Sequence, residues 1–157
     1  MKNLPAPGDW NGGAIKKWNI LLLILRAWLG YRMITAGYSS VVGILSSEEE
    51  RKFFIKWFGD ELHFPLPLQM AFLAKGAELC GGIFLFAGLF SRISSILIAF
   101  TMFVATVTAN LGKNFEIDGG FTISYFLFAL VFIFWGGGKY SLDYLFFHKK
   151  NHAASAA

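Results

Sequence analysis

A chain of 157 residues is long enough for one domain, and this one is 55% hydrophobic and 18% aromatic. Charged residues make up only 15% of it, whereas an average soluble domain carries roughly 25%. The formal net charge is +4, but no basic face with interleaved aromatic residues accompanies it, so nucleic-acid binding is not expected. The composition is typical of an integral membrane protein.

Residues 1–19 are polar and contain proline and glycine, which predicts a flexible cytoplasmic arm before the membrane. The apolar run at residues 20–42 has the length of a transmembrane helix. It is too long for a cleaved signal peptide and is interrupted by Arg26 and Arg32, so we expect it to remain in the protein.

The first loop, residues 43–67, is too long for a simple turn. Ser47 and Glu50 have the spacing of a capping box, which predicts a helix over residues 48–58 that ends at Gly59. Four aromatic residues form its apolar face: Phe53, Phe54, Trp57 and Phe58. Such a helix is expected to lie in the membrane interface, the alternative being a solvated helix in an extramembrane loop.

Three further apolar runs predict three more transmembrane helices, separated by short loops. These runs are residues 68–90, 93–112 and 119–137, with a tight turn at Ser91-Arg92 and a stop at the triple glycine 136–138. The sequence therefore predicts a four-helix transmembrane domain over residues 20–145, followed by a polar C-terminal tail over residues 146–157.

Four crossings place both termini on one side of the membrane, and the distribution of lysine and arginine indicates which side. The terminal side carries Lys2, Lys16, Lys17, Arg92, Lys139, Lys149 and Lys150, and the other side carries Arg51, Lys52, Lys56 and Lys113. We therefore predict a multi-pass protein of the bacterial inner membrane with both termini in the cytoplasm.

Four charged residues fall inside the predicted spans, where each costs about 2.5–3.5 kcal/mol near the bilayer centre. Arg26 lies roughly 9 Å from the cytoplasmic edge, at about 1.5 Å per residue, and could extend its side chain to that edge. By the same count Arg32, Lys75 and Glu78 lie about 10–15 Å from the outer edge of a core about 30 Å thick. Lys75 and Glu78 also share one helix face.

Pairing Glu78 with Arg32 or Lys75 would relieve much of this cost and would leave one cation over. That cation would favour an anion, a carbonyl oxygen or a wet cavity, so the charges predict a polar site inside the bundle. The alternative is a buried ion cluster that only fixes helix packing. Small residues, including Gly30, Gly37 and the Ala77–Gly81 pair, predict close helix contacts beside the cluster.

No metal or haem site is predicted, and no catalytic residue is assigned. The histidines His63, His148 and His152 lack metal-ligand spacing, and the single cysteine, Cys80, lies among small residues of an apolar run. We expect Cys80 to be a packing residue. The chain also lacks a dinucleotide-binding fingerprint and a phosphate-binding loop, so any electron donor must be another chain or a diffusible molecule.

The sequence resembles the DoxX family of small four-helix membrane proteins. The matching stretches are Arg26 with LGYRMITAGYSS, AELCGGIFLFAGLFSR, ISSILIAFTMFVA and GGGKYSLDYLF. The resemblance implies a membrane subunit linked to quinone-dependent redox chemistry, and it carries the family's helix 1 arginine to Arg26 and its helix 2 glutamate to Glu78.

We therefore expect an all-α, integral membrane four-helix bundle with an interfacial amphipathic helix in its first outer loop. Its expected role is a subunit or accessory of a quinone-linked redox complex. The expected ligand site comprises Arg32, Lys75, Glu78 and Arg26, with quinone bound non-covalently. Expected partners are the lipid bilayer and other membrane or periplasmic subunits, or further copies of the chain. The alternatives are a structural or assembly subunit without a ligand and an oligomeric transporter of a small solute.

Overall fold

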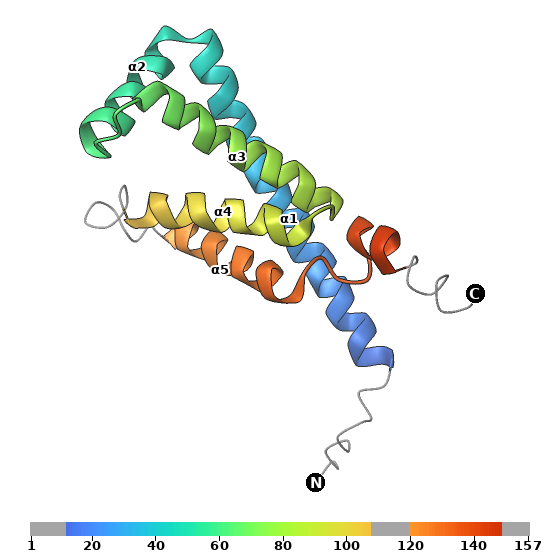
Figure 1. Cartoon of the computed structure of the whole chain (residues 1–157). Helices are drawn as coiled ribbons and strands as arrows, with labels where there is room; N and C mark the ends of the chain where they lie inside the picture. The colour runs from blue at the N-terminus through green and yellow to red at the C-terminus, as the bar shows by residue number, and fades with distance from the viewer. Residues whose placement is uncertain (1–11, 108–119, 149–157) are drawn as a thin grey trace.

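The computed structural model describes residues 12–107 and 120–148, and it is all-α over this part of the chain, as the sequence predicts (Figure 1). The elements are α1 (Gly12–Ser46), α2 (Glu48–Lys56), η1 (Trp57–Glu61), α3 (Pro67–Ala87), α4 (Ser91–Ala105), α5 (Gly120–Trp135) and η4 (Tyr144–His148). Here η marks a π-helical turn. The loop from α2 to the start of α3 closes one end of the bundle, and η4 lies at the opposite end (Figure 1).

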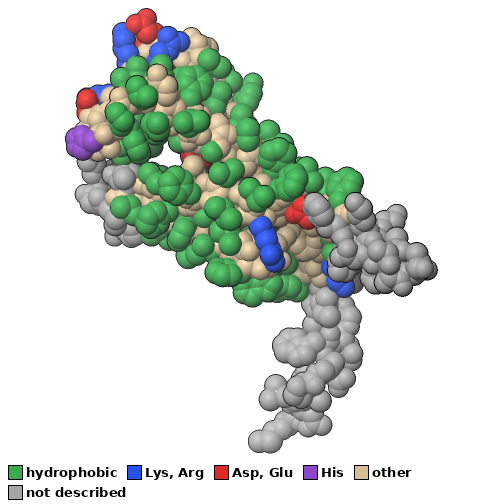
Figure 2. Space-filling model, in the orientation of Figure 1, with side chains coloured by type: hydrophobic (Ala, Val, Ile, Leu, Met, Phe, Trp, Pro, Cys, Tyr) green, Lys and Arg blue, Asp and Glu red, His purple; other side chains and the backbone are tan. Residues whose placement is uncertain are grey.

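The helices of the bundle are apolar on their outer faces. Within α1 and α3, Lys17–Ser46 and Pro67–Ala87 are long and apolar enough to cross a membrane, and α4 and α5 are shorter apolar helices. Hydrophobic side chains cover most of the visible surface of the bundle (Figure 2). Phe100 on α4 and Phe134 on α5 are 67% and 70% exposed. Exposed apolar surface on this scale is unfavourable in water and suits lipid.

Glycines allow α1 and α3 to pack with almost no side chain between them. A Cβ added at Gly37 would lie 2.6 Å from the backbone nitrogen of Leu79, and one at Gly30 would lie 2.8 Å from the backbone of Phe86. Gly81, by contrast, faces α4, where an added Cβ would lie 3.2 Å from Ile98. The predicted close packing at small residues is therefore confirmed, and α3 uses it on two sides.

The aromatic loop, which we define as residues 47–66, begins as predicted and ends differently. Ser47 caps α2 by accepting a hydrogen bond from the Glu50 backbone N–H at 3.3 Å. The predicted stop at Gly59 is wrong, because the chain continues through η1. Gly59 has no left-handed backbone and lies beside Pro67. The chain leaves the helical path only after Leu62, at His63, whose φ is 55°.

Two other predicted boundaries also need correction. Helix α1 begins at Gly12, so residues 12–19 do not belong to a flexible arm. Trp18 packs edge-on against Trp135 at 6.2 Å, and Asn19 accepts a hydrogen bond from the Lys139 backbone N–H at 2.9 Å. These contacts with the last residue of α5 and with the chain after it stabilise the added turns. The remaining residues of the predicted arm and tail, 1–11 and 149–157, lie outside the described residues.

The turn between α3 and α4 comes earlier than Ser91-Arg92. Gly88 ends α3 in a left-handed conformation, with its N–H bonded to the Leu85 carbonyl at 3.0 Å. Phe90 is also left-handed, and Ser91 is already the first residue of α4. Glycine adopts the left-handed conformation without steric cost, so Gly88 fixes where α3 stops. The predicted glycine stop of α5 is confirmed by Gly136, whose φ is 70°.

Candidate functional site

A buried ion pair lies in the middle third of α3. The Lys75 ammonium donates hydrogen bonds to both carboxylate oxygens of Glu78 at 3.0 Å. The Glu78 side chain is only 4% exposed and that of Lys75 16%. Three positions along an α-helix bring two side chains onto the same face, so the pair follows directly from the sequence spacing. The predicted pairing of Glu78 is confirmed with Lys75 as its partner.

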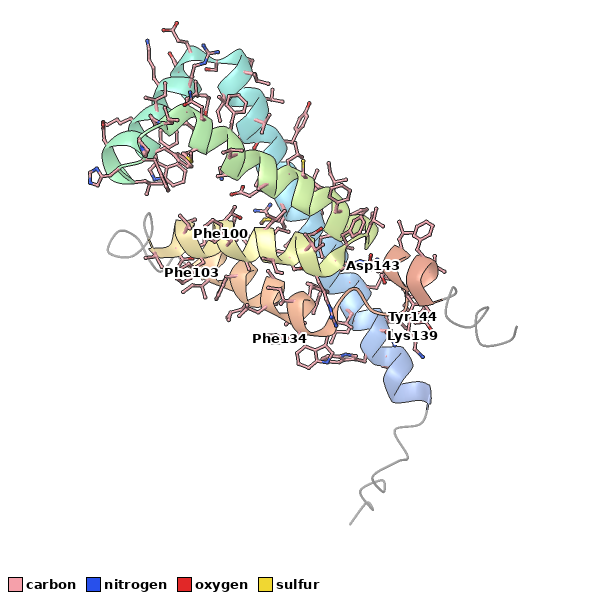
Figure 3. The ribbon with its side chains drawn as sticks, viewed as in Figure 1. Phe100, Phe103, Phe134, Lys139, Asp143 and Tyr144 are labelled. Carbon is pink, nitrogen blue, oxygen red and sulfur yellow. The ribbon has the colours of Figure 1, made fainter. Side chains whose placement is uncertain are left out.

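A cavity of about 490 Å³ opens beside this pair. Its wall is almost wholly apolar, and Lys75 and Glu78 supply its charged part. The aromatic loop contributes Trp57 and Phe58, and α4 contributes Phe100 (labelled in Figure 3). Figure 2 shows a hollow between the aromatic loop and α4. The site is therefore an apolar cavity with charged, hydrogen-bonding groups at one place in its wall, Lys75 and Glu78.

The aromatic loop forms the lid of this cavity because part of its apolar face turns inward. Phe54 and Phe58 are buried against Ile44 of α1 and Ala71 of α3. Phe53 is exposed, so the four aromatic residues do not all share one environment. The helix is amphipathic as predicted, with its inner face packed on the rim of the bundle.

Arg32 lies apart from the ion pair. Its side chain is exposed, and its Nε–H donates to the Tyr125 hydroxyl of α5 at 3.0 Å. Depth along the helix places Arg32 near Lys75 and Glu78, but the direction of its side chain around α1 is toward α5. The structure therefore brings together only two of the residues assigned to the intramembrane cluster.

Arg26 is buried at the other end of the bundle, where its side chain is bonded within the protein instead of extending to solvent as the sequence predicts. Its guanidinium donates to the backbone carbonyls of Gly137 and Tyr140, each at 3.0 Å. Gly88 leaves room for it, because an added Cβ there would overlap the guanidinium. The carbonyls after α5 are not used by a helix, so they accept these bonds. Arg26 is therefore a tie between α1 and the chain after α5, far from the cavity.

Asp143 forms a second tie, between the chain after α5 and the turn from α3 to α4, and the sequence predicts no role for it. Its carboxylate accepts hydrogen bonds from the backbone N–H groups of Phe90, at 2.6 Å, and Ser91, at 2.8 Å. Its own N–H donates to the Gly88 carbonyl at 2.9 Å. A carboxylate at a helix N-terminus accepts hydrogen bonds from the free N–H groups there, and its negative charge interacts favourably with the helix dipole. The signal was the aspartate in GGGKYSLDYLF, whose partners lie more than fifty positions earlier in the chain.

The fold and the site define a class: integral membrane helical bundles with a charged pair set into an apolar interior. The chain belongs to the DoxX family, whose model matches residues 21–111. It is 30% identical, over 142 residues, to the protein named "Putative oxidoreductase CatD" of Bacillus subtilis (strain 168), covering 90% of this chain and 98% of that protein. No solved structure gives a significant match.

Proposed function

We propose that this protein is a membrane subunit or accessory of a quinone-linked redox complex and that a quinone binds in the cavity beside Lys75 and Glu78. The observation that carries the proposal is the combination of an apolar cavity of about 490 Å³ with one buried ion pair. Ligand sites commonly have this character, with an apolar wall and a few fixed polar groups. The name of the Bacillus relative, "Putative oxidoreductase CatD", agrees with a redox role.

The residues present fit a quinone in both size and chemistry. The apolar wall suits its ring and tail, and the Lys75 ammonium of the pair can donate a hydrogen bond to a carbonyl oxygen. An ammonium has three N–H donors, and Lys75 directs two hydrogen bonds to Glu78. The third N–H has no partner among the described residues, so it is available to a ligand oxygen. Glu78 holds the ammonium in place through its two carboxylate oxygens.

When bound, a quinone would itself act as the electron carrier, because its reduction to the quinol takes up two electrons and two protons. Lys75 would orient its carbonyl through the free N–H, and Glu78 would hold a proton at its carboxylate oxygens during exchange. Trp57 and Phe58 would exclude water from the cavity. The electrons come from another subunit or a diffusible donor, so the expected partners are membrane or periplasmic proteins.

A structural or assembly subunit without a ligand is the second candidate function. One observation favours it: Lys75 and Glu78 already pair with each other, so the pair can stabilise the fold even without a ligand. An oligomeric transporter has no comparable support.

The quinone proposal is tested by purifying the protein in mild detergent and measuring bound quinone by its ultraviolet difference spectrum on borohydride reduction. The double variant Lys75→Met with Glu78→Gln removes the charges together and should lose bound quinone. The matched control, Glu48→Gln with Lys52→Met, removes an exposed pair on α2 and should keep it. Equal quinone in both folded double variants would refute the proposal and favour the structural role.

For localisation, we propose the bacterial inner membrane with both termini in the cytoplasm, because lysine and arginine favour the terminal side. In a Cys80→Ala background, a cysteine placed at Ser46 should react with an impermeant reagent in intact cells, and one placed at Asn3 should not. Reaction at Asn3 alone would reverse the orientation.

A further inference from the structure

A second cavity, of about 740 Å³, lies at the opposite end of the bundle from the aromatic loop. It forms where α1, the start of α4 and the chain after α5 meet. Its lining combines basic, aromatic and aliphatic side chains, among them Trp18, Leu22, Arg92, Ile93, Trp135 and Lys139. The site proposed for quinone shares none of these residues.

The cavity has an excess of positive charge. Arg92 and Lys139 both line it, and neither side chain has a hydrogen-bond or ion-pair partner among the described residues. The acidic residue in the wall is Asp143, whose two carboxylate oxygens accept bonds from the Phe90 and Ser91 N–H groups. Figure 3 labels Lys139 and Asp143, which come from the same short stretch after α5. Arg92 and Lys139 are therefore two cations that no carboxylate of the described residues neutralises, and both are available to an anion.

The rest of the cavity is suited to the boundary between headgroups and acyl chains. Trp18 and Trp135 form an edge-to-face pair at 6.2 Å, and both are partly exposed. Tryptophan is enriched at this boundary because its ring is apolar and its N–H is polar. Leu22 and Ile93 extend the wall as apolar surface.

We propose that this cavity binds the phosphate headgroup of an anionic phospholipid, with Arg92 and Lys139 as its cationic contacts and the two tryptophans beside the glycerol and upper acyl chains. Basic pockets between membrane helices recognise anionic lipid headgroups in this way. The lipid is favoured over free phosphate because the charged residues continue into aromatic and aliphatic surface that a small ion would not use.

The test uses the full-length protein with Trp10, Trp28 and Trp57 changed to Phe, so that Trp18 and Trp135 report. In phosphatidylcholine vesicles containing a minor fraction of brominated phosphatidylglycerol, their fluorescence should be quenched more than with the same fraction of brominated phosphatidylcholine. Arg92→Gln with Lys139→Gln should reduce this preference on the order of tenfold. Arg92→Lys with Lys139→Arg should retain it.

The matched control is Lys52→Gln with Lys56→Gln, which removes the same charge from α2 at the other end of the bundle and should leave the preference intact. Equal quenching by both brominated lipids in the parent, or equal loss in the control, would overturn the proposal. Full competition by inorganic phosphate would identify a soluble-anion site and would also overturn the lipid assignment. The parent measurement decides the matter even where the glutamine variants do not fold.

Discussion

Two lysine–glutamate pairs in this protein have similar nitrogen–oxygen distances and very different surroundings. On α2, Lys52 and Glu48 approach to 2.8 Å with side chains 73% and 76% exposed. On α3, Lys75 and Glu78 approach to 3.0 Å with side chains 16% and 4% exposed. One pair is spaced i,i+4 and the other i,i+3, and both spacings bring side chains onto one helix face, so spacing does not predict the difference in exposure.

The comparison shows that solvent exposure, and not the distance between the charges, determines how much each charge depends on its partner. Water and ions screen the α2 pair, and either partner can be solvated if the other is lost. The α3 side chains are mostly withdrawn from the surface, so each charge depends on the other for its stabilisation. A buried pair of this kind also presents a strong local field to anything that enters the cavity beside it.

The largest expected effect follows from breaking the α3 pair on one side. Glu78→Gln leaves the Lys75 ammonium without its carboxylate in a poorly solvated place and should lower the free energy of unfolding by about 3–5 kcal/mol. Unfolding of the purified protein by sodium dodecyl sulfate in mixed micelles measures this loss. Unchanged stability would contradict the buried-pair account and remove the main support for the quinone site.

Removing both charges should be less harmful than removing one. Lys75→Met with Glu78→Gln should leave a loss of about 1–2 kcal/mol, because no unpaired charge remains. Comparing both single variants with the double variant gives the coupling between the side chains. Strictly additive losses would mean that the pair makes no net interaction.

A smaller effect is expected at Arg32, which is exposed and has a neutral partner. Tyr125→Phe removes the hydroxyl that accepts from the Arg32 Nε–H and should cost about 0.5–1.5 kcal/mol. The same mixed-micelle unfolding measures it. A loss as large as that of Glu78→Gln would show that Arg32 also belongs to a buried charge network.

The smallest effect belongs to the exposed pair. Glu48→Gln should cost about 0.3–0.5 kcal/mol, as for other exposed helix pairs, and the cost should shrink as salt is added. Unfolding at low and high ionic strength measures both quantities. A salt-independent loss of several kcal/mol would erase the distinction between the two pairs.

The sequence predicts best what depends on neighbouring residues. The Ser47 cap of α2, the left-handed glycine after α5 and the Lys75–Glu78 pair all rest on local spacing, and all three are found. The predicted helix end at Gly59 is wrong. It rests on the general preference of glycine for helix ends, but here the helical backbone continues through Gly59 as far as Leu62.

Contacts between distant segments could not be predicted in the same way. Depth along α1 correctly separates Arg26 from Arg32, but it carries no information about rotation around the helix axis. Rotation turns Arg32 toward Tyr125 instead of Glu78. Arg26 finds carbonyls more than a hundred positions away, and no pattern near either segment signals that meeting.

The Arg26 tie has a consequence for biogenesis. The guanidinium is made with the first helix, but its acceptor at Gly137 lies 111 positions later in the chain. During synthesis, α1 therefore enters the bilayer with a charge that has no native acceptor until the last helix is complete. In ribosome-bound chains that stop short of Gly137, the position of α1 along the membrane normal should be variable. Completion of the chain should fix that position.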